Sequence, residues 1–172
     1  DLELRPMGFG TEQVEEEIST LFPQAKVERL DFDTARTRSA YERILSNFEQ
    51  RKTQILIGTQ MLSKGLDFDN VSVVGILHAD SLMNFPDFRA HERAYQLMAQ
   101  VSGRAGRREK QGTVILQSSQ PEHPLIQLVE NHDYQRMARL QLTERSMFRY
   151  PPYYRLIEIV LRSRNESILQ EL

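Results

Sequence analysis

Two short apolar runs set the architecture of this chain: Gln54-Ile-Leu-Ile-Gly58 and Val71-Ser-Val-Val-Gly-Ile-Leu77. Each has the length of one strand and is almost wholly apolar, which is typical of strands buried on both faces of a sheet. A third run of this kind is Gly112-Thr-Val-Ile-Leu-Gln117, and we expect a further short strand at about 26–30. The sequence therefore predicts several short strands inside the protein.

The segments between these strands have helical periodicity. In residues 11–22 the apolar side chains recur at i, i+4, i+7 and i+8, and Pro23 ends the pattern. Residues 40–48 and 88–102 have similar apolar faces, and two more helical stretches cover about 123–147. Helices that alternate with apolar strands predict an α/β fold with a mostly parallel sheet flanked by helices on both faces. Ligands of such sheets bind at the carboxyl ends of the strands.

The composition limits the classes of function. The 172 residues suffice for one domain, or one domain and a piece of a second. Lys and Arg total 22 against 24 Asp and Glu, a net charge of -2, so the composition alone does not indicate a nucleic-acid-binding protein. The absence of cysteine excludes disulfides, thiol catalysis and a cysteine-ligated zinc within the chain. No apolar run approaches the length needed to cross a bilayer, so we expect no membrane partner.

The segment Gln100-Val-Ser-Gly-Arg-Ala-Gly-Arg107 carries the clearest chemical pattern. On a helix, Gln100, Arg104 and Arg107 would lie within an arc of about 60°. Two neighbouring guanidinium groups repel each other unless an anion lies between them, and their planar donors suit phosphate. Gly103 leaves room for close approach. We interpret the segment as a phosphate-binding stripe; the alternative is a solvated basic helix end.

The loop from Gly58 to Val71 is a second candidate. Thr59 follows a predicted strand and is suited to capping a short helix, whose free amides would accept a phosphate. Lys64 adds a positive charge, and Gly65 permits a turn. Asp67 supplies a carboxylate either for a ribose hydroxyl or for ordering the arginines. A plain loop between two strands remains an alternative.

Together these segments resemble the motifs of the second RecA-like lobe of superfamily two helicases. Within that superfamily they are closest to the primosomal replication-restart helicases of the PriA family. The likeness rests on Gly10-Thr-Glu12, the Gly58 to Val71 loop, Pro86-Asp-Phe-Arg-Ala90, Gln100 to Arg107, Pro121-Glu-His-Pro124 and Tyr150-Pro-Pro152.

The resemblance implies a fragment of an ATP-dependent DNA helicase that moves 3′ to 5′ in replication restart and primosome assembly. It assigns the arginine finger and its neighbours, as catalytic residues, to Arg107, Arg104 and Gln100. Nucleotide contacts fall to Gly65, Asp67 and Gly103. Contacts with the nucleic acid fall to Thr59, Gln60 and Lys64.

The resemblance also implies cofactors and partners. ATP with magnesium would sit mainly on another lobe, because this sequence has neither a Gly-x-x-x-x-Gly-Lys-Ser/Thr loop nor an acidic magnesium box. The fragment alone is therefore expected to be inactive. Zinc is expected in a module upstream of residue 1, and no metal in this chain. The expected partners are DNA, bound without sequence preference, and the primosome and single-strand-binding proteins of a cytoplasmic helicase.

The family pattern gives the expected domain organisation. Residues 1–12 would be a leading segment after an absent zinc-binding module, and 13–142 would form the RecA-like lobe. Residues 143–172 would contain the junction and the truncated start of a further domain, with a new strand from Leu156 to Leu161.

Two departures from the pattern leave roles open. Lys64-Gly-Leu-Asp-Phe68 resembles the general superfamily motif more than the histidine-containing form of some family members. His78 stands where the family often has an acidic residue, so the roles of His78 and Asp80 are unassigned. Two alternatives also remain: a lobe of another superfamily two DNA translocase, or a non-catalytic RecA-like module that binds DNA or protein.

Several conspicuous side chains receive a structural interpretation. The four histidines lack the spacing of metal ligands, and Glu15-Glu16-Glu17 is read as a solvated helix face. Phe85, Phe88 and Tyr95 are expected to pack in the core or between lobes, although aromatic side chains also stack on bases.

Overall fold

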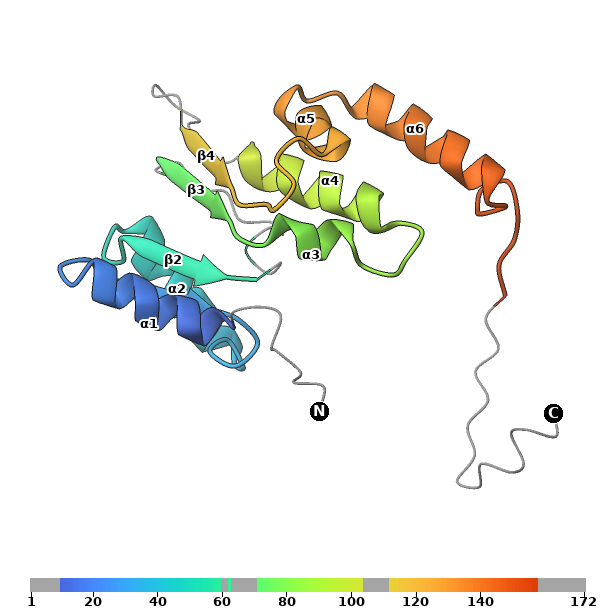
Figure 1. Ribbon diagram of the computed structural model, residues 1–172. Helices are drawn as coiled ribbons and strands as arrows, with labels where there is room; N and C mark the ends of the chain where they lie inside the picture. The colour runs from blue at the N-terminus through green and yellow to red at the C-terminus, as the bar shows by residue number, and fades with distance from the viewer. Residues whose placement is uncertain (1–9, 60–61, 63–70, 104–111, 158–172) are drawn as a thin grey trace, which may run out of the picture.

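The computed structural model describes residues 10–59, 62, 71–103 and 112–157. In this part of the chain helices and strands alternate, which confirms the α/β class (Figure 1). The elements in chain order are α1 (Thr11–Leu21), β1 (Val27–Leu30), α2 (Arg38–Glu49), β2 (Ile55–Gly58), β3 (Val73–Ile76), α3 (Ala79–Met83), α4 (Ala90–Ser102), β4 (Thr113–Leu116), α5 (Pro124–Glu130) and α6 (Tyr134–Met147).

The described strands form two parallel pairs. β1 pairs with β2, with Leu30 opposite Gly58 at the carboxyl end. β3 pairs with β4, with Ile76 opposite Leu116. The predicted parallel pairing is therefore confirmed, but the four strands are arranged as two two-stranded sheets. In Figure 1 the carboxyl ends of β2 and β3 point toward the same side of the molecule, the side on which α3 lies.

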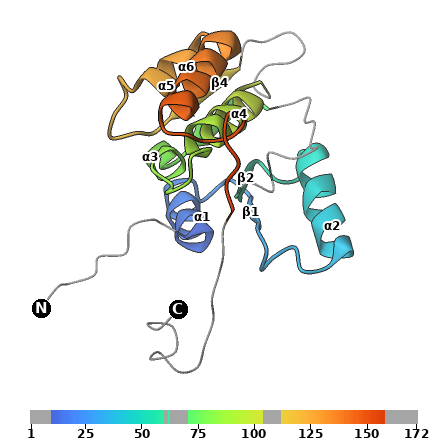
Figure 2. The same ribbon diagram turned by 90° about the vertical axis from the view of Figure 1, so that its right-hand side faces the viewer.

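The two pairs differ in how their faces are covered. Figure 2 shows β1 and β2 between α1 and α2, as expected for a sheet with helices on both faces. In β3 and β4, exposed residues alternate with half-buried ones, and Val73 and Ile115 are each 59% exposed. The prediction that the run Val71 to Leu77 is buried on both faces is therefore wrong for β3, and its partner β4 is exposed on one face in the same way. The side chains of Ile76 and Leu116, on the other face, pack against the main helical core.

The core has two parts that follow the helical periodicity. The larger cluster joins α3, α4, α5 and α6 through buried residues such as Ala94, Met98 and Leu125. The smaller cluster contains Leu30, Ile44 and Leu45, which join β1 to α2. The sequence did not predict α3, because five residues are too few to show a helical period.

The C-terminal helices follow the predicted helical stretch. Residue 143, where the expected junction begins, lies inside α6, which continues to Met147, and the domain boundary itself stays a prediction. The helical pattern then ends before the Pro151–Pro152 peptide, which is cis. Leu156 and Ile157 lie outside any strand, and the rest of the strand predicted there lies outside the described residues. None of the described helices is long and apolar enough to cross a membrane.

Gly58 permits the close approach of β1 and β2. A Cβ at this position would lie 2.5 Å from the Leu30 carbonyl oxygen and 2.7 Å from the Leu62 side chain. The backbone oxygen cannot move away without disturbing the strand pair. Gly58 is therefore required by packing, directly before the loop that carries the candidate site residues.

We predict that Gly58→Ala lowers the free energy of unfolding by about 1–3 kcal/mol, the usual cost of overpacking a close contact. Urea unfolding of the chain measures this change. Gly75→Ala is the matched control, because a Cβ on this strand glycine meets nothing within 4 Å. Equal stability of the two variants would contradict the close-approach argument.

Candidate functional site

Polar groups gather at the carboxyl ends of the strands, and the sequence singled out three of them, Thr59, His78 and Asp80. Because each pair is parallel, Asp31 and Thr59 follow neighbouring strand ends, and so do His78 and Gln117. Strand ends of this kind form the ligand-binding edge of α/β sheets. We therefore take this edge as the candidate site.

Asp31 fixes the end of β1. This residue is only 6% exposed. Its carboxylate accepts hydrogen bonds from the Thr11 hydroxyl at 2.6 Å, the Asp33 amide at 3.0 Å and the Thr34 amide at 2.9 Å. Burial raises the pKa of Asp31, but the hydrogen bonds from Thr11 and Thr34 outweigh it, and the net pKa lies below the ordinary value. The carboxylate thus joins the start of α1 to the end of β1.

Arg29 extends this network to the acidic face of α1. Its Nε lies 3.3 Å from a carboxylate oxygen of Asp31 and 3.3 Å from one of Glu15. Of the three adjacent glutamates, Glu16 and Glu17 are exposed as expected, whereas Glu15 is half-buried in this ion pair. The interpretation of the whole glutamate run as a solvated face is therefore wrong for Glu15.

The end of β2 leads into the segment with most of the predicted contacts. Thr59 is exposed, and its carbonyl oxygen accepts a hydrogen bond from the Leu62 amide at 3.0 Å. The structure thus places Thr59 beside the end of β1. Gln60, Lys64, Gly65 and Asp67 lie outside the described residues, so their roles stay predictions.

Asp80, whose role the sequence left open, joins the ends of β3 and β4. Its carboxylate accepts hydrogen bonds from the Ser118 hydroxyl at 2.7 Å and the Ser119 amide at 2.8 Å. The Ser119 amide is the main reason why the pKa of Asp80 lies below its ordinary value, and the Ser118 hydroxyl adds to the effect. His78 has a left-handed backbone with φ of 53° just before α3, and its amide donates to the Gln117 side chain at 3.3 Å.

The Pro86-Asp-Phe-Arg segment anchors the start of α4. Asp87 accepts hydrogen bonds from the Arg89 amide at 2.8 Å and from the Arg93 guanidinium at 2.6 Å. The Arg89 amide is the largest cause of the lowered pKa of Asp87, and the charge of Arg93 lowers it further. A charged Asp87 therefore holds the turn against the first turns of α4.

Phe88 joins this turn to the end of α6. Its ring stacks on Tyr150 with centroids 5.0 Å apart, and the guanidinium carbons of Arg89 and Arg145 each lie 5.1 Å from its centroid. Arg145 also forms an ion pair with Glu92 on α4. The prediction that Phe88 packs within the protein is confirmed.

The other two aromatic side chains behave differently from each other. Tyr95 is 4% exposed and belongs to the main core, as predicted. Phe85 is 59% exposed, so it does not pack in the core of this chain, and its packing between lobes stays a prediction.

The C-terminal end of α4 carries the first residue of the predicted phosphate stripe. Gln100 is exposed in the last turn, and the helix ends at Ser102. Gly103 caps the helix, and its amide donates to the Ala99 carbonyl at 3.0 Å. Arg104 and Arg107 lie outside the described residues, so a shared stripe with Gln100 stays a prediction.

Comparison with known proteins tests the family assignment. Residues 9–109 match the family model of the helicase conserved C-terminal domain. The matched residues include both candidate segments, Gly58 to Val71 and Gln100 to Arg107. The chain belongs to this helicase family. The match covers α1 to α4, so the ends of β1, β2 and β3 lie within the matched helicase domain, whereas β4 lies outside it.

Curated relatives extend the similarity over nearly the whole chain. The chain is 49% identical over 153 residues to the replication restart protein PriA of Bacillus subtilis, which covers 89% of this chain and 19% of that protein. It is 44% identical over 168 residues to PriA of Synechocystis, covering 98% of this chain and 20% of that protein. It is 47% identical over 146 residues to PriA of Haemophilus influenzae, and this match covers 85% of this chain and 20% of that protein. The chain thus spans about a fifth of the length of these relatives.

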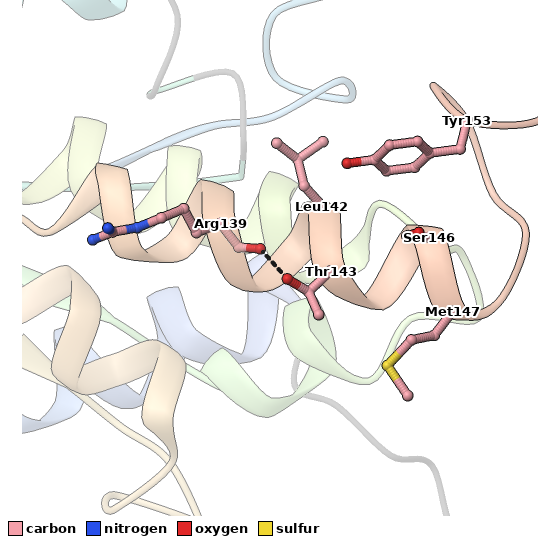
Figure 3. Close-up of a pocket in the computed structure, with 6 residues that line it drawn as sticks. All are labelled: Arg139, Leu142, Thr143, Ser146, Met147 and Tyr153. Carbon is pink, nitrogen blue, oxygen red and sulfur yellow. Dashed lines mark hydrogen bonds between the residues drawn. The ribbon is translucent and has the colours of Figure 1, made fainter.

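A shallow groove in the C-terminal part of the chain lies away from the strand ends. It runs along α6 and is lined by Arg139, Leu142, Thr143, Ser146, Met147 and Tyr153 (Figure 3). The Thr143 hydroxyl donates to the Arg139 carbonyl within the helix at 2.9 Å. The predicted site residues that the structure describes, Thr59, Gln100 and Gly103, do not line this groove.

His91 and His123 make structural contacts. Among the described residues there is no group of three or more His, Asp or Glu side chains able to hold a metal. The rings of His91 and His123 meet edge to face with centroids 5.6 Å apart. His123 caps α5, because its Nδ1 accepts the Leu125 amide at 3.2 Å. Burial, aided by His91, lowers the pKa of His123 below its ordinary value of 6.5, and Asp80 partly offsets this.

The His123 cap should make stability depend on pH in a defined window. Because the folded pKa is depressed, the unfolded chain takes up the proton first, so stability falls as the pH drops below about 6.5 and on toward the folded pKa. His123→Asn keeps a capping acceptor without this titration. We expect the variant to lose less stability than the unaltered chain between about pH 7 and about pH 5, measured by urea unfolding. His132→Asn, at an exposed position, is the control, and identical pH profiles for all three proteins would refute the assignment.

Proposed function

We propose that this chain is the second RecA-like lobe of an ATP-dependent DNA helicase that acts in replication restart. The observation that carries the proposal is the helicase-family match across residues 9–109, joined to 49% identity with a replication restart protein over 89% of the chain. The similarity to PriA of Synechocystis over 98% of the chain includes the segments with Thr59, Lys64, Arg104 and Arg107. The direction of movement is 3′ to 5′, as the family resemblance implies.

In this proposal the chain completes an ATP site whose main part lies on another lobe. Arg107 is the arginine finger that contacts the γ-phosphate, with Arg104 and Gln100 beside it. Gly65, Asp67 and Gly103 contact the nucleotide, and magnesium accompanies ATP on the other lobe. An arginine finger accelerates phosphoryl transfer by about 10³ to 10⁵, or roughly 4–7 kcal/mol of the barrier. No residue of this chain is assigned to zinc.

The anchoring of α4 supports this assignment. Its first turns are held by Asp87 and by the Phe88 cluster with Arg145 and Tyr150, and its last turn carries Gln100. A helix held rigidly at one end keeps the residues at its other end in a defined position, which catalysis by positioned charges requires.

DNA is proposed to bind through its backbone at the segment after β2. Thr59, Gln60 and Lys64 contact phosphates, so binding is independent of sequence and weakens with salt. Primosome proteins and single-strand-binding proteins are the further partners that the family resemblance suggests.

The finger assignment predicts a selective loss of activity. In the full-length protein that carries this chain, Arg107→Ala should lower DNA-stimulated ATP hydrolysis by roughly 10³- to 10⁵-fold while DNA affinity stays nearly unchanged. Steady-state ATPase assays and a DNA-binding titration measure the two quantities.

Arg136→Ala is the matched control for this variant, because Arg136 is exposed on α6 away from the strand ends. It should keep full activity. Unimpaired hydrolysis in Arg107→Ala would remove the finger assignment.

The DNA-track assignment predicts a change in salt dependence. Each phosphate contact to single-stranded DNA contributes about 0.7 to the slope of log K against log salt. Lys64→Ala should therefore make the slope less steep by about 0.7, measured by fluorescence anisotropy at several salt concentrations. Lys52→Ala is the control, because Lys52 is exposed at the other end of β2. The same slope in Lys64→Ala as in the unaltered protein would refute the contact.

A further inference from the structure

Phe32 is a large apolar side chain held out in solvent at the ligand-binding edge. It is 82% exposed and follows directly after the carboxyl end of β1. Because Leu30 pairs with Gly58, the residues after β1 leave the sheet next to Thr59, the first residue of the proposed DNA track. An exposed aromatic ring thus lies at the edge where the proposed DNA contacts begin.

The backbone on both sides of Phe32 is fixed. The Asp31 carboxylate accepts the amides of Asp33 at 3.0 Å and Thr34 at 2.9 Å, which closes the turn around Phe32. The Thr34 hydroxyl donates to the Arg29 carbonyl at 2.9 Å, and the Ala35 amide donates to the Asp31 carbonyl at 3.0 Å. The ring is therefore presented by a rigid turn, which reduces the entropy lost when a ligand stacks on it.

Cationic side chains follow Phe32 in the chain, Arg36 on the same loop and Arg38 at the start of α2. Arg36 and Arg38 have side chains 72% and 91% exposed, in surface ion pairs with Asp33 and Glu42. Exposed pairs of this type contribute little stability, so the guanidinium groups remain able to exchange a carboxylate for a phosphate. A surface that combines an aromatic ring with cationic side chains is the kind that binds single-stranded nucleic acid, where bases stack on the ring and phosphates meet the charges.

We propose that Phe32 is a stacking platform for a base of single-stranded DNA. The proposal rests on the proposed function, because it extends the same DNA track from the end of β2 to the end of β1. Stacking on a ring face accepts any base, so the contact adds affinity without sequence preference. The phosphates on either side of the stacked base lie toward Arg36 and Arg38 and toward Thr59.

The test compares two single-stranded ligands of equal length and charge, an oligothymidylate and an abasic oligomer. In the full-length protein that carries this chain, Phe32→Ala should weaken binding of the oligothymidylate by about 5- to 150-fold. Binding of the abasic oligomer should stay unchanged, since it offers phosphates but no base. Phe32→Trp should keep the affinity for the oligothymidylate.

Phe22→Ala is the matched control. Phe22 is 52% exposed and lies at the opposite end of the same strand pair, before β1 begins, so neither ligand should bind differently. Thermal melting of each variant checks that the fold is kept.

Two outcomes would overturn the proposal. Equal weakening of both ligands would mean that Phe32 supports the local fold or packs against another part of the protein, and unchanged affinity for both would mean that no base stacks on it. Failure of the proposed function is distinguishable, because the unaltered protein would then bind neither ligand.

Discussion

The hydrogen-bonded carboxylate of Asp31 is the interaction on which the proposed site depends. It joins the Thr11 hydroxyl at the start of α1 to the end of β1 and closes the next turn through the Thr34 amide. Because β1 runs beside β2 up to the tight contact of Leu30 and Gly58, this turn has a fixed position next to the loop after β2. The start of α1, the turn after β1 and Thr59 at the end of β2 are thus held at one edge by ordinary backbone geometry.

Two other carboxylates in the chain also hold a turn or loop by accepting backbone amides. Asp80 binds the loop after β4, and Asp87 binds the turn before α4. In both, backbone amide donors lower the pKa, so the carboxylate is charged at neutral pH and its hydrogen bonds are strong. Phe88 and Arg145 then connect the start of α4 to α6. The proposed function, in which the lobe moves as a unit between nucleotide states, requires connections of this kind between the sheet edge and the helices.

The sequence predicted the helices and strands whose apolar residues recur at a regular spacing. It did not predict features that depend on contacts between residues far apart in the chain. The helical faces of α1, α2 and α4 and the parallel pairing follow from apolar spacing and from chain order. Burial of β3 was predicted wrongly, because an apolar run does not reveal whether a second layer covers it; Val73 is 59% exposed. The bond from Ser118 to Asp80 spans 38 positions, and no local pattern encodes it. Phe32 was missed, because its exposure follows from the turn that Asp31 closes.

The central claim is that this lobe offers an arginine to a triphosphate bound mainly by another lobe. The most direct measurement is an experimental structure of the full-length protein with a non-hydrolysable ATP analogue and single-stranded DNA. We predict that the Arg107 guanidinium lies within about 2.7–2.9 Å of a γ-phosphate oxygen, the distance of a charge-assisted hydrogen bond. The account would be contradicted if Arg104 and Arg107 pointed to opposite sides of the lobe, or were paired with carboxylates of their own lobe away from the nucleotide.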